Sequence, residues 1–416
     1  MTSSRAWAPA LAWIALACHA CAGAVGGAPR REPAPGFIEI DGDGFRDAAT
    51  GRPWVPVGAN YDHDARGRLI EDYWHEEWAR VEGDFEEMAR LGFTVVRVHL
   101  QLGRFMKDAT TLDERELERL DRLVTLSARL DLRLDLTGLA SYRKHDIPAW
   151  FLALDDERMA AAEAAFWRGI AARYAGEPAV YCYDLQNEPI VSLADTSEIV
   201  GPPLVGVEGT YHFINLKGRD VSRAWTRWVR DRYGAEGALA AAWSGYPRPG
   251  ETFDRIALPG LLDRLRNEDL VRFGHDRAAD WTRRMVSAIR ESDRRHLVTI
   301  GLLPDSLPFG EIYSSFAPAV LADLLDFVSV HLHVREEGGR DNALESEMVA
   351  RAAYVGKPVV VEELSMLVAP KKRRGASSNA PARARPGSWA TTGATRPRSC
   401  GPGGPCATAS PRTRSR

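Results

Sequence analysis

Cysteine is scarce in this sequence and lies mostly near the two ends. Of 416 residues only five are cysteine, and Cys18, Cys21, Cys400 and Cys406 lie close to the termini. The central region holds only Cys182, so internal disulfides do not stabilise it, and a zinc site built on paired cysteines is excluded there. Cys182 lies in an apolar run, which is typical of a small buried side chain and not of a nucleophile.

Acidic residues are missing from the last part of the chain. Residues 364–416 contain no Asp or Glu but eleven Lys or Arg. The formal net charge of −3 includes these eleven positive charges, so residues 1–363 carry a net charge of −14. A body this acidic repels a phosphate backbone, and nucleic acid is therefore not an expected partner. The composition also excludes a collagen, a coiled coil and a wholly disordered chain.

Glycine-rich phosphate loops are also absent. No predicted strand is followed by G-x-G-x-x-G or by a Walker sequence. The first strand leads instead into Asn60-Tyr61-Asp62-His63, where a dinucleotide-binding protein usually has its loop. Nucleotide chemistry is therefore not expected.

The N-terminus has the layout of a secretory signal peptide. Arg5 precedes an apolar stretch over 8–17 and small residues around Ala20–Ala24. The stretch is too short to span a bilayer. We predict a signal peptide over 1–25, a linker over 26–36, and a secreted or periplasmic protein without a membrane span. Because Leu16-Ala17-Cys18 loosely resembles a lipoprotein box, a lipid-anchored lipoprotein is the alternative.

Strand-like and helix-like segments alternate from residue 37 onward, after a small hairpin predicted over 37–47. Such alternation is typical of an α/β domain with a parallel sheet. Seven apolar runs predict strands: Trp54–Ala59, Thr94–Leu100, Leu132–Thr137, Val180–Gln186, Leu297–Leu302, Phe327–Leu332 and Val359–Glu362. Apolar residues every three or four positions predict four of the intervening helices: Glu76–Leu91, Glu114–Leu130, Ala160–Tyr174 and Asp276–Ser292. This number of units predicts a (β/α)₈ TIM barrel over 37–366, whose chemistry lies at the C-terminal ends of the strands.

Two predicted strands end in glutamate. The run ending in Asn187-Glu188-Pro189 places a carboxylate before a proline that stops the strand, and the run over 357–361 leads into Glu362-Glu363. Two carboxylates on different strands are what glycoside hydrolysis requires: one protonates the leaving oxygen, and the other attacks the anomeric carbon or activates water. The alternative is that both are ordinary surface acids.

These motifs resemble a clan A glycoside hydrolase, and most of all the cellulases and mannanases of family 5. The resemblance covers roughly residues 37–366 and implies that Glu188, after the fourth strand, is the acid/base and that Glu363, after the seventh, is the nucleophile. It implies retaining hydrolysis of β-O-glycosidic bonds in a poly- or oligosaccharide by a two-glutamate double displacement without metal or cofactor. A monomer is expected. Glu362 is the rival of Glu363, and because strand residues alternate, only one of the two is expected to point inward.

Further positions match the family residue by residue. The first-strand motif brings Asn60 and Tyr61 to the substrate, and Arg97 ends the second-strand segment and would hold the nucleophile ionised. A surface ion pair is the alternative for Arg97. Asn187 would donate to the sugar 2-hydroxyl, with a simple turn residue as the alternative. The list of substrate-binding candidates is completed by His331 and His333 on the sixth strand.

Several features depart from the family. His333 stands where a tyrosine is usual, and Asp135-Leu136-Thr137-Gly138 ends the third strand where a histidine is frequent. A pair His331-x-His333 would also suit a metal-dependent hydrolase, although no further ligand cluster accompanies it. Residues 190–295 form a long insertion rich in tryptophan, which either covers the mouth of the cleft and favours exo-cleavage or only packs its own helices.

The largest departure follows Met366. No eighth strand and helix are recognisable, and 367–416 has the composition of a disordered basic tail. A frameshift in a GC-rich gene explains this break, and a basic targeting or polymer-binding tail is the alternative. The barrel therefore lacks a proper eighth βα unit. A carbohydrate-binding pseudoenzyme, inactivated by that loss, is the alternative function.

Overall fold

The structure is a computed structural model. It describes residues 36–142, 146–191, 216–217, 220–259, 264–303, 315–335, 349, 352, 355–367 and 391–392. The predicted signal peptide, nearly all of the linker and most of the predicted tail lie outside these residues. Among the described residues, no helix is both long and apolar enough to cross a membrane.

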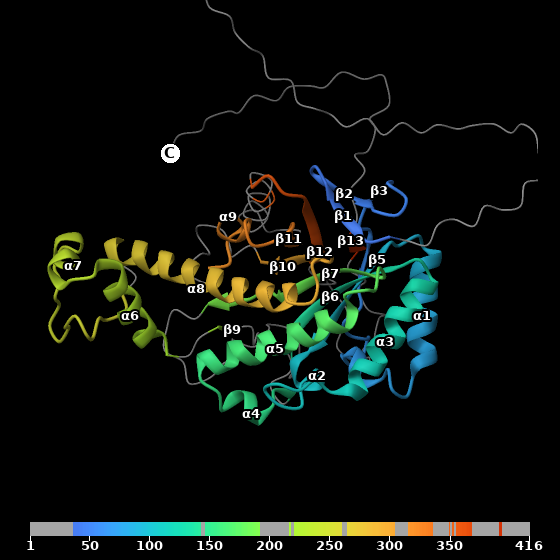
Figure 1. The fold of residues 1–416 in the computed structure, drawn as a ribbon, viewed down its shortest axis with the longest axis horizontal. Helices are drawn as coiled ribbons and strands as arrows, with labels where there is room; N and C mark the ends of the chain where they lie inside the picture. The colour runs from blue at the N-terminus through green and yellow to red at the C-terminus, as the bar shows by residue number, and fades with distance from the viewer. Residues whose placement is uncertain are drawn as a thin grey trace, which may run out of the picture. The chain divides into compact units, whose positions relative to one another are not determined.

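Seven parallel strands of the described chain form the barrel sheet. Their order is that of the sequence. The strands are β4 (Gly58–Asn60), β5 (Val95–Gln101), β6 (Arg133–Ala140), β7 (Val180–Asn187), β10 (Leu297–Leu302), β11 (Val328–Arg335) and β12 (Val359–Leu367) (Figure 1). This confirms the predicted α/β class and the incomplete (β/α)₈ barrel.

The barrel interior is polar although its strands are buried. Every residue of β5, β6 and β7 is buried. Because side chains alternate along a strand, the leucines and valines face the surrounding helices and the residues between them face inward. The inward set carries charge on three neighbouring strands: Arg97, Asp135 and Asp184.

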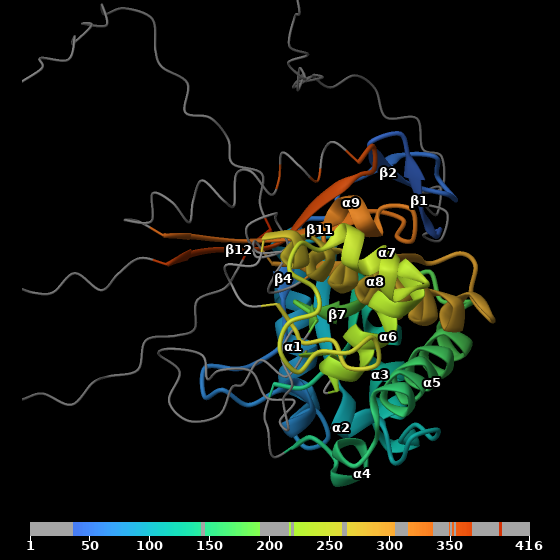
Figure 2. The same ribbon diagram turned by 90° about the vertical axis from the view of Figure 1, so that its left-hand side faces the viewer.

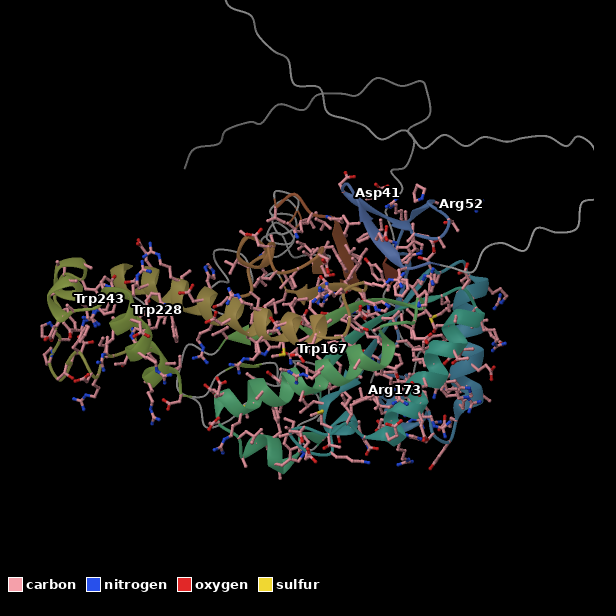
Figure 3. All side chains as sticks on the ribbon, in the orientation of Figure 1. Asp41, Arg52, Trp167, Arg173, Trp228 and Trp243 are labelled. Carbon is pink, nitrogen blue, oxygen red and sulfur yellow. The ribbon has the colours of Figure 1, made fainter. Side chains whose placement is uncertain are left out.

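Helices cover the outside of the sheet. They are η1 (Ile70–Asp72), α1 (Trp78–Arg90), α2 (Leu102–Phe105), α3 (Glu114–Arg129), α4 (Ala149–Leu152), α5 (Asp156–Tyr174), α8 (Arg264–Arg290) and α9 (Pro318–Leu321). Two of them, α3 and α5, begin at an aspartate cap: Asp113 accepts from the Arg115 amide and Asp155 from the Arg158 amide. Trp167 of α5 is fully buried, and its indole N–H donates to the Leu185 carbonyl of β7 at 3.3 Å (Figure 3).

A small antiparallel sheet covers the N-terminal ends of the strands. It consists of β1 (Ile38–Asp41), β2 (Gly44–Asp47) and β3 (Pro53–Trp54), which confirms the predicted hairpin. Phe45 packs edge-on against Tyr181 and Phe327, which lie at or just before the starts of two barrel strands. Figures 1 and 2 show the hairpin on the side away from α4. The single strand predicted over 54–59 is wrong, because Trp54 pairs with Phe45 here and β4 begins only at Gly58.

The insertion after β7 contains a second apolar cluster. It is built from α6 (Val221–Tyr233), α7 (Glu236–Ala242) and the first part of α8, which begins well before the predicted Asp276. Trp225 stacks on Trp228 and on Trp243, with ring centroids 5.5 and 5.8 Å apart (Figure 3). These tryptophans therefore pack the helices of the insertion, as one of the two readings of the sequence expects. The strands β8 (Ile190–Val191) and β9 (Leu216–Lys217) form a separate parallel pair.

The two ends of the parallel sheet, β4 and β12, meet through a side chain. Asn60 Nδ2 of β4 donates to the Glu362 carbonyl of β12 at 3.1 Å. The outer edge of β4 is paired with β13 (Thr391–Thr392), which runs antiparallel to it and comes from the predicted tail. A two-residue antiparallel strand therefore lies where a (β/α)₈ barrel has an eighth parallel strand.

We expect Trp225→Ala to destabilise the insertion by about 3–5 kcal/mol, because it removes a fully buried indole stacked on two others. Urea unfolding followed by tryptophan fluorescence measures the loss. Trp228→Ala, at a partly exposed position, is the matched control and is expected to cost less. Equal effects of the two substitutions would contradict the packing role of Trp225.

Candidate active site

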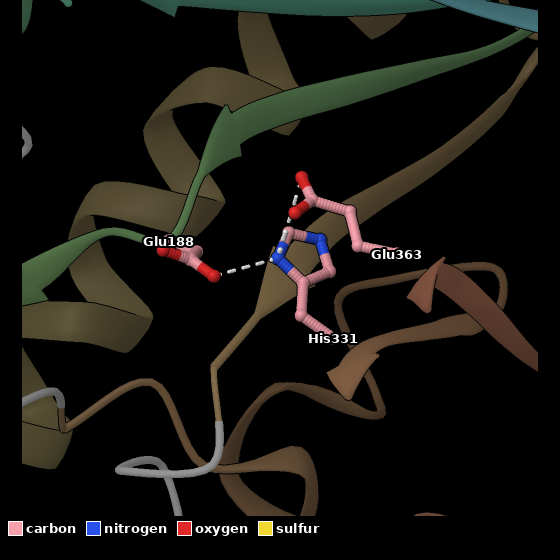
Figure 4. Close-up of side chains that lie close together, drawn as sticks. All are labelled: Glu188, His331 and Glu363. Atoms are coloured by element: carbon pink, nitrogen blue, oxygen red, sulfur yellow. Dashed lines mark hydrogen bonds and ion pairs between the residues drawn. The ribbon is translucent and has the colours of Figure 1, made fainter. Parts of the chain in front are cut away.

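Four predicted residues converge at the C-terminal ends of the barrel strands. Arg97 comes from β5, Glu188 follows β7, His331 lies in β11 and Glu363 in β12. Figure 4 shows the two glutamates on either side of the His331 ring. Residues that are 266 positions apart in the chain, Arg97 and Glu363, are thus in direct contact.

Arg97 is the centre of the hydrogen-bond network. It is 3% exposed, and its Nη1 donates to Glu363 Oε1 at 2.6 Å. Its Nη2 donates to Asp184 Oδ2 at 2.6 Å and to Asn187 Oδ1 at 3.0 Å. Burial opposes the charge of Arg97, but the neighbouring carboxylates raise its pKa well above the usual value. The geometry thus agrees with the predicted contact to Glu363, and the alternative of a surface ion pair is wrong.

His331 lies between three carboxylates. Its Nδ1 is 2.8 Å from Glu188 Oε1 and 3.6 Å from Glu363 Oε1, and its Nε2 is 3.3 Å from Glu362 Oε2. Burial alone would lower the pKa of His331, but Glu363, Glu188 and Glu362 together raise it to about 10. His331 is therefore a doubly protonated cation at neutral pH and donates from both nitrogens.

Glu188 has an unusual backbone conformation. Its φ is 48°, in the left-handed region that non-glycine residues rarely adopt. Its amide N–H donates to the Gly301 carbonyl of β10 at 3.0 Å, which anchors the chain where β7 ends before Pro189. Strain of this kind concentrates at functional sites, where the surrounding structure maintains it.

Both glutamates of β12 point into the barrel, so the expectation that only one does so is wrong. The register of β12 against β11 pairs Val361 with Val330 and then Glu363 with His331. Glu362 is the extra residue of a β-bulge at this step, and a bulge breaks the alternation of side chains. Glu362 is consequently 3% exposed, and burial, which would raise its pKa, is outweighed by Arg97 and His331, which lower it to about 2.

Some of the remaining predicted residues belong to the hydrogen-bond network of Arg97, and others do not. Asn60 accepts from Arg97 Nη1 at 2.9 Å, and Asn187 accepts from the same guanidinium, so both belong to the network. Tyr61 does not, because alternation turns it toward α1, where its hydroxyl donates to Asp84 at 2.7 Å. Its role in substrate binding stays a prediction. His333 pairs with Ser365 in the sheet, and its side chain lies outside the described part of the structure.

Two acids of the site were not predicted. Asp184 accepts from Arg97, from the Thr137 hydroxyl at 2.8 Å and from the Gly301 amide at 2.9 Å. Asp135 is buried, and its pKa is raised well above the usual value by burial and by Glu362. In the sequence, each of the two is a charged residue within an apolar strand run, and a buried charge is rarely tolerated without a partner.

Further unpredicted polar residues lie at the end of β5. The hydroxyl of Tyr142 contacts His99 Nδ1, and the Tyr142 amide donates to Gln101 Oε1 at 3.2 Å. Burial and the charge of Arg97 lower the pKa of His99 to about 3, so this imidazole is neutral. Among the described residues no partner is found for His99 Nε2, Gln101 Nε2 or Glu71 Oε2.

Two carboxylate groups of the described chain have the spacing of metal ligands. One combines Glu188, His331 and Glu363, and the other combines Asp135, Asp184 and Glu362. In the first, both ring nitrogens of His331 already contact carboxylates, Nδ1 that of Glu188 and Nε2 that of Glu362. The second is already paired with the guanidinium of Arg97. The donor sets therefore suit charge pairing within the protein better than a metal ion.

The fold and the site define a class: a parallel α/β barrel with two carboxylates facing each other across its C-terminal end. Residues 59–200 match the family model described as "Cellulase (glycosyl hydrolase family 5)". This match agrees with the resemblance to glycoside hydrolase family 5 that the motifs at the strand ends predict. A search of curated proteins finds no match.

Solved structures with a related chain trace include glycosidases. An exo-beta-1,4-mannosidase from Opitutaceae bacterium strain TAV5 is 18% identical, with a TM-score of 0.48, over 78% of this chain and 48% of that one. A beta-galactosidase from Marinomonas ef1 is 18% identical, with a TM-score of 0.48, over 67% and 40%. A beta-mannanase from the blue mussel Mytilus edulis is 15% identical, with a TM-score of 0.44, over 79% and 83%. The chain thus spans about half or less of the length of the first two.

We expect Gly301→Ala to disturb the site. A Cβ on Gly301 would lie 2.6 Å from His331 Nε2 and 2.9 Å from Glu362 Oε2, so both side chains must move. Such overpacking costs about 1–3 kcal/mol of unfolding free energy, measurable in urea, and should also lower turnover. Gly83→Ala in α1, where nothing lies within 4 Å, is the control and should leave turnover unchanged. Unaltered turnover of Gly301→Ala would show that the site does not need the close approach of Gly301 to His331 and Glu362.

We also expect the stability of the protein to depend on the protonation of Glu71. Burial raises the pKa of Glu71 to about 8 from the ordinary 4.5, so the folded state binds this proton more tightly than the unfolded state. The stabilisation is complete below about pH 4.5 and is lost as the pH rises through 8, by up to about 1.4 kcal/mol per pH unit. Urea titrations of wild type and Glu71→Gln should therefore diverge in favour of the variant above pH 5. A constant difference across this range would contradict the shift.

Proposed function

We propose that the protein hydrolyses β-O-glycosidic bonds of poly- or oligosaccharides with retention of configuration. The observation that carries this proposal is the closeness of the two carboxylates. An oxygen of Glu188 and an oxygen of Glu363 lie within 4.8 Å of each other. Retaining enzymes keep their carboxyl groups about 5–5.5 Å apart, whereas inverting enzymes separate them by about 6.5–9.5 Å to admit a water.

Glu363 is proposed as the nucleophile. Arg97 donates to its Oε1 at 2.6 Å, which orients the carboxylate and favours its ionised form. In the first step Glu363 attacks the anomeric carbon, the bond to the leaving oxygen breaks, and that oxygen takes the proton of Glu188. The product is a covalent glycosyl-enzyme and a free hydroxyl.

Glu188 is proposed as the acid/base. In the second step its carboxylate takes a proton from water, and the resulting oxygen nucleophile displaces Glu363 from the anomeric carbon. The enzyme returns to its starting protonation state. The 2.8 Å contact with His331 holds Glu188 in place for both transfers. The N-terminal sequence pattern further supports the proposal that the enzyme is exported.

A carbohydrate-binding pseudoenzyme is the second candidate. It is favoured by β13, which replaces the eighth parallel strand with two antiparallel residues. In a complete barrel of this kind the eighth strand brings a further wall to the site. Binding of oligosaccharides by the purified chain, measured by calorimetry without any release of product, would support this candidate.

Azide rescue distinguishes the roles of the two glutamates. With an aryl β-glycoside that has a good leaving group, Glu363→Ala plus azide should form the α-glycosyl azide, because azide replaces the nucleophile in a single inverting displacement. Glu188→Ala plus azide should form the β-anomer, because azide then attacks the glycosyl-enzyme.

Both variants should lose turnover without azide, Glu188→Ala by about 10²–10⁴-fold for leaving groups that need protonation. Product anomers are identified by NMR, and Glu86→Ala on the exposed face of α1 serves as the control. The same anomer from both variants would refute the assignment.

A further inference from the structure

Glu362 occupies a position that the reaction itself does not explain. The bulge of β12 turns its carboxylate inward beside the reactive pair, yet its contacts are with the protein. Ser329 Oγ donates to its Oε1 at 3.2 Å, and His331 Nε2 lies 3.3 Å from its Oε2. Arg97 Nη2 is 3.5 Å from the same oxygen.

The contact between Glu362 and His331 requires a glycine at position 301. Gly301 of β10 lies directly beneath both side chains, and a side chain at this position would collide with them. The carbonyl of Glu362 also accepts from Asn60. Backbone and carboxylate of Glu362 are therefore both fixed, as a group that orients another requires.

We propose that Glu362 is a positioning residue that keeps His331 charged and aimed at Glu188 and Glu363 throughout the catalytic cycle. The inference rests on the proposed function of the site.

The argument depends on which charges change during turnover. Glu188 carries its proton in the free enzyme and loses it when the glycosyl-enzyme forms, while Glu363 becomes an ester and loses its negative charge. Of the three carboxylates around His331, only Glu362 takes no part in either step. Glu362 thus keeps its negative charge beside the buried imidazolium of His331, while Glu188 gains a negative charge and Glu363 loses one.

The groups that determine the charge of His331 come from four elements. They are Arg97 and His99 on β5, Glu188 after β7, His331 itself on β11, and Glu362 and Glu363 on β12. Asp135 and Asp184 lie behind Glu362 and act through it. His99 is neutral, so Arg97 is the competing cation. Arg97 pairs with Asp184 and Glu363 at 2.6 Å each and lies 3.5 Å from Glu362, whereas His331 Nε2 lies 3.3 Å from Glu362.

The test replaces the charge and keeps the shape. In Glu362→Gln, the titration of His331 followed by ¹⁵N NMR should shift its midpoint down by about 1–3 pH units relative to wild type. The His331 signal is assigned by its loss in His331→Asn. The alkaline limb of kcat/KM for an aryl β-glycoside should move in the same direction, and kcat should fall more than KM rises. Glu362→Asp, which restores the charge, should recover part of both effects.

An unchanged His331 midpoint in Glu362→Gln overturns the proposal, as does a lowered midpoint with unaltered turnover. Ser329→Ala, which removes one donor to Glu362, is the milder variant if Glu362→Gln does not fold, and it should lower the midpoint by a smaller amount. The NMR titration needs no activity. If wild type hydrolyses no glycoside, the proposed function fails, while the titration still decides whether Glu362 controls His331.

Discussion

The buried guanidinium of Arg97 is the constraint on which the rest of the site depends. A charge at 3% exposure is costly unless carboxylates pair with it, and Arg cannot escape the cost by losing its proton. Its partners come from β4, β7 and β12, and so the register of these strands is tied to one side chain. The same bonds orient the carboxylate proposed as nucleophile.

The second cation, His331, completes the charge balance of the barrel interior. Four acids surround the two cations closely: Asp184, Glu188, Glu362 and Glu363. A fifth, Asp135, lies behind them, and burial beside Glu362 raises its pKa well above the usual value. The interior thus holds more acids than cations, and their surroundings shift their pKa values in opposite directions, upward for Asp135 and downward for Glu362.

The sequence predicts the residues proposed to react better than it predicts the side chains around them. Glu188, Glu363 and Arg97 stand at the ends of apolar runs, so strand order alone brings them to one end of the barrel. The inward turn of Glu362 depends on a bulge against β11, a strand about 30 residues away, and alternation within β12 cannot reveal it. Tyr61 lies outside the network for the opposite reason: side chains alternate without interruption there, so that of Tyr61 faces α1. The early start of α8 follows from packing on α6 and α7 and not from its own periodicity.

The bulge at Glu362 also links the site to barrel closure. Between β4 and β12 the described residues place no backbone ladder, and the bond from Asn60 to the Glu362 carbonyl spans this gap. Asn60 is held for this bond by Arg97, which donates to its Oδ1. A change in the charge network that moves Arg97 therefore loosens the contact between the first and last parallel strands. Site geometry and closure of the incomplete barrel are two consequences of one set of hydrogen bonds, and a barrel that lacks its eighth parallel strand depends on them more than a complete barrel would.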